Sequence, residues 1–237
     1  MSLPKPYYDD GNGIQIFLGD CREILPQLEP VDLVLTDPPY GIADIWSGGS
    51  VHHGWSKANR ERGLRNQWDR EPPSAEVLSL VKSKGSKVII WGGNYFDLAP
   101  SRGWLVWNKP ERGFSLAEAE LAWTNVDAVI RVYDCNRSDP GREHPTQKPL
   151  DLMKWCIAWS KVEGTILDPF MGSGTTLRAA KDLGRKCIGI EISREYCDIA
   201  IRRLQQETLP LQCEQIEKRE GSVQSSMFLF DRKTREQ

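Results

Sequence analysis

The sequence predicts a doubly wound α/β domain built around a mostly parallel sheet. Short apolar runs rich in β-branched residues alternate along the chain with segments of helical spacing. That alternation is typical of strands covered by helices on both faces. The length of 237 residues suits one large domain, which can bury roughly 70–75% of the surface that its unfolded chain exposes, so no metal or disulfide is needed to hold the core together.

Each expected strand is a short apolar run bounded by polar or turn-forming residues. In chain order these runs are 14–18, 31–36, 87–91, 104–107, 128–132, 165–168 and 186–190. The expected helices repeat their apolar residues at helical spacing, over 75–84, 150–160, 175–183 and 194–205. Ser193 is well placed as the N-cap of the last helix, and Gly184 can close the preceding helix in the left-handed conformation.

Three regions interrupt this pattern. Residues 41–71 are Gly-rich and lack a steady period, and the region around 133–148 is polar and rich in turn formers. A long loop inside a domain is usually either functional or disordered. We expect residues 209–237 to form a charged C-terminal extension, whose small apolar patch at 227–230 docks on the domain.

Composition and charge argue against several classes of protein. The formal net charge is −2, which alone argues weakly against a dedicated nucleic-acid-binding module. No apolar stretch approaches the roughly 18 residues that cross a bilayer, and the first ten residues lack the apolar core of a secretion signal. We therefore expect a cytoplasmic protein without membrane contact. The six cysteines include no CxxC pair and the three histidines have no ligand spacing, so we expect no metal site.

The first motif that carries chemistry is Thr36-Asp37-Pro38-Pro39-Tyr40, directly after an expected strand. It places a carboxylate at the carboxyl edge of the sheet, where open α/β sheets bind ligands. The two prolines make the corner rigid and remove amide donors, so the Asp37 carboxylate and the Pro38 carbonyl remain as acceptors. With the ring of Tyr40, these acceptors suit a planar amino group, which has two N–H donors and a flat face. Taken alone, the same residues could simply end a strand and pack Tyr40 into the core.

The second motif, LDPFMGSGTT at 167–176, also lies between an expected strand and an expected helix. It is not a P-loop, because no Lys follows Gly174, and Leu177 stands where the dinucleotide fingerprint needs a third glycine. Glu191 ends the next expected strand, 17 residues after Gly174, near the distance at which an acidic residue accepts hydrogen bonds from a ribose. The motif therefore fits a nucleoside without a pyrophosphate, and S-adenosylmethionine (SAM) has that description.

Together, TDPPYG and LDPFMGSGTT resemble the motifs of the amino-group DNA methyltransferases, which modify N6 of adenine or N4 of cytosine. The Asp-Pro-Pro-Tyr motif precedes the Gly-rich motif by about 130 positions, as in the circularly permuted β class of that family. Weaker matches follow the same order, so the resemblance spans residues 14 to about 205; they lie at 19–21, 91–96, 107–109 and 144–149. The resemblance implies a Rossmann-like SAM-dependent methyltransferase fold, with one catalytic and SAM-binding domain over 1–208 and a small DNA-recognition insertion.

The resemblance also implies roles for individual residues. Those that would hold and methylate the target amino group are Asp37, Pro38, Pro39 and Tyr40. Asp20 would accept from the amino group of the cofactor's adenine, and 144–149 would line its methionine end. The residues implied to bind SAM are Asp20, Cys21, Asp37, His144, Thr146, Lys148, Asp168, Phe170, Gly172, Ser173, Gly174, Thr175 and Glu191. Cytosine members of the family usually carry Ser where Asp37 stands, so Asp37 favours adenine, with N4 of cytosine as the alternative.

Two segments fit contacts with double-stranded DNA, which the resemblance implies as substrate. Residues 41–70 hold five basic residues against three acidic ones, together with three of the nine tryptophans. Basic residues interleaved with aromatic ones suit phosphate neutralisation and wedging into a distorted duplex; alternatively, the tryptophans anchor the loop and the arginines are solvated. A second basic set lies in 131–148, where the class often places its target-recognition segment. The residues expected at DNA are Trp46, His52, His53, Trp55, Lys57, Arg60, Arg62, Arg65, Arg131, Arg137 and Arg142.

Functions from other classes stay open. RNA and protein methyltransferases also carry Asp-Pro-Pro or Asn-Pro-Pro corners, but typically with the cofactor motif first. The intact Asp37, Tyr40 and Glu191 disfavour a catalytically idle DNA- or cofactor-binding regulator, and the missing third glycine disfavours a nicotinamide oxidoreductase. The sequence leaves undecided the recognition site, a homodimer, a cognate restriction endonuclease, and a phage or cellular origin.

Overall fold

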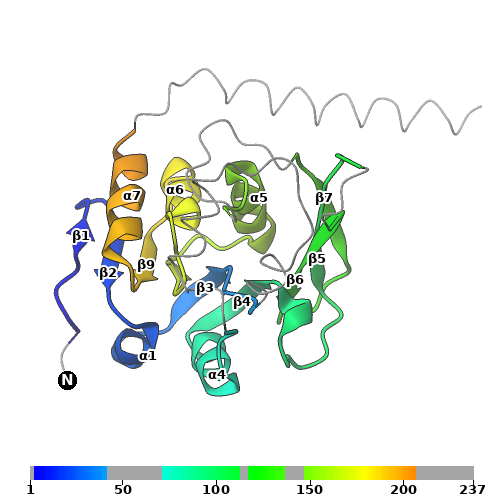
Figure 1. The fold of residues 1–237 in the computed structure, drawn as a ribbon, viewed down its shortest axis with the longest axis horizontal. Helices are drawn as coiled ribbons and strands as arrows, with labels where there is room; N and C mark the ends of the chain where they lie inside the picture. The colour runs from blue at the N-terminus through cyan, green and yellow to red at the C-terminus, as the bar shows by residue number, and fades with distance from the viewer. Residues whose placement is uncertain (1–2, 42–70, 113–116, 137–146, 207–237) are drawn as a thin grey trace, which may run out of the picture. The chain divides into compact units, whose positions relative to one another are not determined.

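The computed structural model describes residues 3–41, 71–112, 117–136 and 147–206. The chain divides into two units, Met1–Gln205 and Gln206–Gln237, and the fold reported below is that of the first. In its described part, nine strands form one sheet with the order β1-β2-β9-β8-β3-β4-β6-β5-β7 (Figure 1). None of the helices in these ranges combines the length and the apolar character that crossing a lipid bilayer requires.

The sheet is mostly parallel, as predicted. Its strands are β1 (Tyr8–Asp9), β2 (Ile14–Leu18), β3 (Val31–Thr36), β4 (Gly85–Trp91), β5 (Trp104–Asn108), β6 (Ala119–Thr124), β7 (Arg131–Asp134), β8 (Ile166–Asp168) and β9 (Cys187–Glu191). β2, β9, β8, β3 and β4 run parallel to one another. β1 and β6 run antiparallel to their neighbours, and β7 pairs in parallel with β5. Because β6 is antiparallel, its first residues lie at the edge where the parallel strands end.

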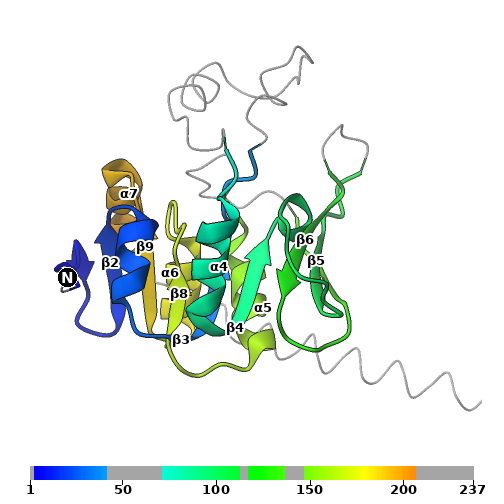
Figure 2. The ribbon, with the colours of Figure 1, turned by 90° about the horizontal axis from the view of Figure 1, so that it is seen from below.

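Helices cover both faces of the sheet (Figures 1 and 2). α1 (Cys21–Ile24), the 3-10 turn η1 (Leu25–Gln27) and α4 (Ala75–Ser83) lie on one face, and α5 (Leu150–Ser160), α6 (Thr175–Asp182) and α7 (Arg194–Gln205) lie on the other. The central strands alternate between the two cores: Leu33 and Leu35 pack with α5 and α6, whereas Val34 packs with η1 and α4. The doubly wound α/β architecture expected from the sequence is therefore confirmed.

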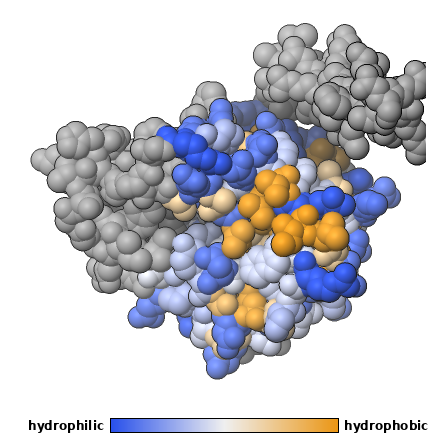
Figure 3. All heavy atoms as spheres, turned by 90° about the vertical axis from the view of Figure 1, so that its right-hand side faces the viewer, coloured by the Kyte–Doolittle hydropathy of each residue, from blue (hydrophilic) through white to orange (hydrophobic). Residues whose placement is uncertain are grey.

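Most elements begin and end within two residues of their predicted bounds, but the far end of the sheet differs. The run at 128–132 was expected as a strand, whereas β7 begins only at Arg131. Val129 and Ile130 are each 58% exposed and Val132 is 60% exposed, so this apolar run marks an exposed sheet end rather than a buried strand. Figure 3 shows apolar surface on this side of the molecule. β6 was not predicted, because only its second half is buried and its sequence AELAWT has no clear period. Gly184 does adopt the left-handed conformation after α6, with φ +64°.

Candidate active site

Adjacent strand ends bring the two sequence motifs together. β3 and β8 are neighbours in the sheet and end at Thr36 and Asp168. The Thr36 hydroxyl donates to Asp168 Oδ1 at 2.7 Å across 132 positions of sequence. The Thr176 hydroxyl donates to Oδ2 at 2.6 Å, and the Phe170 amide donates to Oδ1 at 3.1 Å. Burial raises the pKa of Asp168 to about 6, and these three donors favour its ionised form. Asp168 thus ties the Asp-Pro-Pro-Tyr corner to the Gly-rich turn.

Asp37 is oriented by two donors, one on each carboxylate oxygen. The Lys148 ammonium donates to Oδ2 at 2.5 Å, and the Tyr40 hydroxyl donates to Oδ1. Lys148 Nζ also donates to the Tyr40 hydroxyl oxygen at 3.1 Å. Hydrogen bonds therefore fix the side chain of Asp37, and the two prolines that follow it restrict its backbone.

The charge states of this corner follow from burial and from the neighbouring charges. Burial raises the pKa of Asp37, against the opposing effect of Lys148. Burial also raises the pKa of Tyr40 well above its usual value, and the Asp37 charge raises it further. Burial alone would lower the pKa of Lys148, but Asp37 and Glu120 outweigh it, so that the pKa of Lys148 is raised. At neutral pH Lys148 is therefore an ammonium and Tyr40 a neutral phenol, and the ammonium favours the ionised form of Asp37.

The ring of Tyr40 is set by the segment that follows β4. Tyr40 stacks on Tyr95, which ends the 3-10 turn η3 (Gly93–Tyr95), with centroids 4.9 Å apart and planes at 16°. Phe96 meets the Tyr40 ring edge-on at 6.1 Å. Gly92 has φ +69°, and a Cβ there would lie 2.1 Å from Tyr40 Cε1, so the ring can occupy this position only beside glycine. Tyr95 is 49% exposed, which leaves aromatic surface open beside the Tyr40 ring.

The Gly-rich turn faces acceptors on the neighbouring strands. Glu191, at the end of β9, accepts from the Gly172 amide at 3.0 Å and from the Ser193 amide at 2.8 Å. Burial raises the pKa of Glu191. Asp20 follows β2, which pairs with β9, and its carboxylate caps α1 through the Arg22 amide and pairs with the Arg22 guanidinium. A Cβ on Gly172 would meet nothing within 4 Å, so there is open space beside the backbone of the turn.

The structure gathers most of the expected residues at this one edge. They are Asp20, Cys21, Asp37, Pro38, Pro39, Tyr40, Lys148, Asp168, Phe170, Gly172, Ser173, Gly174, Thr175 and Glu191. Lys148 was expected at the cofactor's methionine end, and its ammonium contacts Asp37 and Tyr40. Arg131 is the exposed first residue of β7, at the end of that strand away from this edge. The expected residues outside the described ranges are Trp46, His52, His53, Trp55, Lys57, Arg60, Arg62, Arg65, Arg137, Arg142, His144 and Thr146.

Three contributors to the site were not predicted. Glu120 lies 3.1 Å from Lys148 Nζ, and its other oxygen pairs with Lys109. Lys109 lies in a weak family match, whereas Glu120 had no signal, because its strand β6 was not recognised. The third is Arg203 on α7, which is 8% exposed and donates to the Ser173 carbonyl oxygen at 2.6 Å and to the Thr175 hydroxyl at 3.2 Å. A buried arginine in an amphipathic helix gave no sign of this contact with the Gly-rich turn.

The chain resembles known DNA methyltransferases in sequence and in fold. A family model described as DNA methylase, of the N6/N4 type, matches residues 104–202. The type II methyltransferase M2.DpnII of Streptococcus pneumoniae is 54% identical over 262 residues, which cover 86% of this chain and 94% of that protein.

Two solved structures share the fold. The M1.HpyAVI–SAM complex has a TM-score of 0.54 and 24% identity, covering 81% of this chain and 100% of that one. The cytosine-N4-specific PvuII DNA methyltransferase has a TM-score of 0.55 and 16% identity, covering 83% and 88%. The site geometry and the sequence relatives agree: the chain belongs to the amino-group (N6/N4) DNA methyltransferase family.

Proposed function

We propose that the chain transfers the methyl group of SAM to the exocyclic N6 of an adenine that has flipped out of duplex DNA. The observation that carries this proposal is the Asp37 carboxylate, which Lys148 and Tyr40 hold at the carboxyl edge. The residue before it, Thr36, is hydrogen-bonded to Asp168 beside the Gly-rich turn. An acceptor for an amino group and a nucleoside site are thus fixed relative to each other.

The residues on the Gly-rich side fit SAM. Glu191 would accept from the ribose hydroxyls and Asp20 from the adenine amino group, and the open space at Gly172 lets a ligand approach the backbone. When bound, SAM supplies an electrophilic methyl group on a sulfonium. A protein of the same fold, M1.HpyAVI, forms a SAM complex, which supports this assignment. The division of the chain after Gln205 supports a single catalytic and SAM-binding domain over residues 1–208.

The chain's own residues orient the target amino group. The amino group of a base stacked in the duplex cannot reach the active site, and flipping the base out costs roughly a few kcal/mol. Tyr40 would stack on the base, while Asp37 and the carbonyl of Pro38 accept the two N6 hydrogens. These bonds draw the nitrogen lone pair out of conjugation and turn it toward the methyl group, and holding both reactants in register supplies much of the acceleration. The extra proton then leaves to Asp37 or to solvent, and no covalent enzyme intermediate is needed.

Contacts with DNA are proposed for the two basic segments named above. Nearly all of these residues lie in 42–70 and 137–146, outside the described ranges, and Arg131 is the described member of the set. With a formal net charge of −2 on the whole chain, such contacts would give modest affinity that falls steeply with salt.

Adenine is proposed over cytosine because Asp37 stands where the cytosine members usually carry Ser. N4 of cytosine is the second candidate, since the PvuII enzyme shares the fold. The protein should be incubated with duplex DNA and SAM labelled with tritium on its methyl group, and the digested nucleosides should be separated. We expect label in N6-methyladenine. Label in N4-methylcytosine would establish the alternative, and no label despite bound SAM would reject DNA as the substrate.

The type II name of M2.DpnII supports extending this proposal to a restriction–modification pair. Methylation by this chain would then protect one DNA sequence from a cognate endonuclease. DNA from cells that express the chain is expected to resist endonucleases that recognise the methylated sequence. If every such endonuclease cleaves all of the methylated sites, the extension is contradicted.

Glu191→Ala is expected to weaken SAM binding by about 10- to 150-fold, because the loss of one charge-assisted hydrogen bond costs about 1.5–3 kcal/mol. Isothermal titration calorimetry with SAM measures this loss directly. Glu195→Ala is the matched control, since Glu195 is exposed in the first turn of α7, and it should bind SAM as the unmodified protein does. Equal affinities for the two variants would remove Glu191 from the SAM site.

A further inference from the structure

Asp37 is one of four charged side chains that meet at the carboxyl edge. Lys148 Nζ lies 2.5 Å from Asp37 Oδ2 and 3.1 Å from Glu120 Oε2, and Glu120 Oε1 pairs with Lys109. The side chains of Lys148 and Lys109 are only 6% and 7% exposed, and those of Asp37 and Glu120 are 23% and 24% exposed. Two carboxylates thus alternate with two ammonium groups in a largely buried cluster whose charges balance.

The four groups come from four separate segments. Asp37 follows β3 and Lys109 follows β5. Lys148 lies two residues before the start of α5, and Glu120 is the second residue of β6. β6 runs antiparallel to both β4 and β5, so its start reaches the edge at which β3 and β5 end. The antiparallel strand therefore supplies the second carboxylate. If β6 ran parallel to its neighbours, its second residue would lie at the opposite edge of the sheet.

The Lys148 ammonium donates to two oxygen atoms and forms an ion pair with a third. These are Asp37 Oδ2 at 2.5 Å, the Tyr40 hydroxyl at 3.1 Å and Glu120 Oε2 at 3.1 Å. An ammonium held from three directions cannot turn away from Asp37 without losing a charged partner. Glu120 thereby fixes the group that orients Asp37, although none of the contacts above joins Glu120 to Asp37 itself.

Lys109 offsets the charge of Glu120. Its ammonium also lies 4.4 Å from the centroid of the Trp107 ring. Without Lys109, two partly buried carboxylates would share one ammonium, and like charges close together disfavour ionisation. Without Glu120, two ammonium groups would serve one carboxylate, and its ionisation would become easier. Other titratable groups that face the cluster are Asp168, Cys156, Tyr95 and, on the turn after β5, Arg112.

We propose that Glu120 and Lys109 are positioning residues of the methyl transfer: Glu120 holds Lys148, and through it Asp37, aimed at the target amino group, and Lys109 offsets the charge of Glu120 so that Asp37 stays ionised. This inference rests on the proposed function, because it assigns Asp37 to that reaction. The directions of the pKa shifts support it. Burial raises the pKa of Asp37, as does the charge of Glu120, whereas Lys148 and Lys109 overcome burial and lower the pKa of Glu120 to about 2.

The two charge-removing variants are expected to move the pH profile in opposite directions. The acid limb of kcat/KM reports an ionisation of the free enzyme, here that of Asp37. Glu120→Gln removes a negative charge, so the limb should move to lower pH, and Lys109→Gln removes a positive charge, so it should move to higher pH. Each shift should be about half a unit or more, and the double variant should return toward the original position. A role in folding alone would not produce opposite shifts.

Glu118→Gln is the matched control, because Glu118 lies just before β6 and its side chain is 64% exposed. It should leave the limb in place. Shifts in the same direction, or none, in variants that keep the fold by circular dichroism would overturn the inference. If Lys109→Gln does not fold, the Glu120→Gln shift decides.

A second measurement separates this inference from the proposed function. Carbon-13 NMR of the Asp37 carboxyl, assigned with Asp37→Asn, follows its titration without any DNA. If the unmodified protein methylates no DNA, the proposed function fails, and opposite shifts of the Asp37 titration still support the electrostatic role of Glu120 and Lys109. If the unmodified protein methylates DNA but the Asp37 titration is unchanged in both variants, this inference fails while the proposed function stands.

Discussion

Replacing Asp37 with Asn is expected to lower kcat for DNA methylation by about 10³-fold, while the affinity for SAM changes by no more than about threefold. The substitution keeps the size of the side chain but removes the negative charge and one of the two acceptor oxygens. Lys148 and Tyr40 donate to both oxygens of Asp37, so an amide nitrogen in this place would face a donor. The amino group of the base would then lose the acceptor that draws its lone pair out of conjugation.

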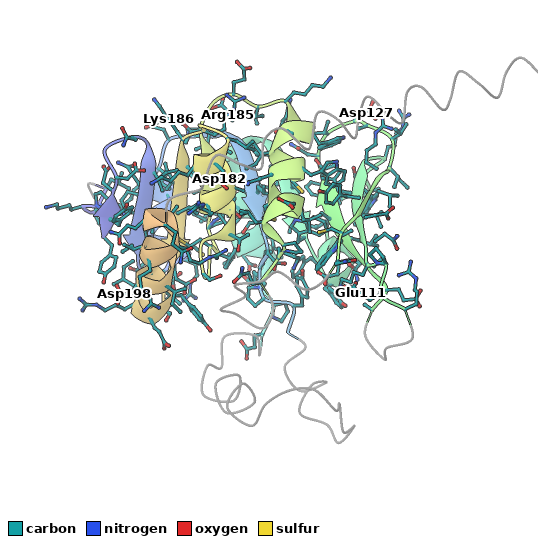
Figure 4. The ribbon with its side chains drawn as sticks, turned by 90° about the horizontal axis from the view of Figure 1, so that it is seen from above. Glu111, Asp127, Asp182, Arg185, Lys186 and Asp198 are labelled. Atoms are coloured by element: carbon teal, nitrogen blue, oxygen red, sulfur yellow. The ribbon has the colours of Figure 1, made fainter. Side chains whose placement is uncertain are left out.

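Asp127→Asn is the matched control for this variant. Asp127 is an exposed partner of Arg102 and lies at the edge of the sheet opposite Glu111, which follows β5 (Figure 4). Single-turnover experiments measure the rate of methyl transfer without a contribution from product release, and calorimetry with SAM measures the affinity. The assignment of Asp37 would be wrong if Asp37→Asn kept more than about one tenth of the rate, or if its loss of rate were matched by an equal loss of SAM affinity.

Gly92→Ala is expected to lower kcat by about 100-fold or more, because the added methyl group displaces the Tyr40 ring. A Cβ at Gly92 would lie 2.1 Å from Tyr40 Cε1 and 2.6 Å from two further ring atoms, far inside van der Waals contact. Tyr40 cannot move alone, since it stacks on Tyr95 and donates to Asp37. A shift of about 1 Å at a catalytic group can cost about 10²-fold in rate. SAM affinity should stay near that of the unmodified protein, because the Gly-rich turn lies on another strand end.

Gly11→Ala separates this contact from backbone strain. Gly11 has φ +70°, close to the +69° of Gly92, but a Cβ there would meet nothing within 4 Å. Gly11→Ala should therefore lose about 1 kcal/mol of stability to the left-handed backbone, measured by urea unfolding, and should keep its activity. Gly92→Ala should lose at least that much stability, because the contact with Tyr40 adds to the strain, and it should also lose activity. Equal activities of the two folded variants would show that the Tyr40 position does not limit catalysis.

The parts of the fold that could be predicted are those whose side chains have one clear environment. In β3 every residue except Asp32 is buried, so the apolar residues on both sides of Asp32 identify the strand, and Asp37 and Glu191 follow from where such strands end. β6 escaped because Ala119, Glu120 and Leu121 are not fully buried, and their mixed character fits no period. Glu120 could not be assigned to the site without that strand.

The ion pairs of the site could not be predicted from the sequence for a different reason. Lys148 belongs to a motif that implied cofactor contact, but its partners Asp37 and Glu120 lie 111 and 28 positions away. Only the order of strands in the sheet shows that the start of an antiparallel strand meets the ends of parallel ones. The net charge of −2 likewise conceals a cluster in which each carboxylate has its own lysine.

Sequencing the modified bases in DNA from cells that express this chain, compared with cells that express Asp37→Asn, tests the central claim most directly. The claim is that an Asp37 carboxylate, held by Lys148 and Tyr40, directs methylation to N6 of adenine. We expect N6-methyladenine at one recurring sequence with the unmodified chain and none with Asp37→Asn. N4-methylcytosine at that sequence, or equal adenine methylation by the two proteins, would contradict it.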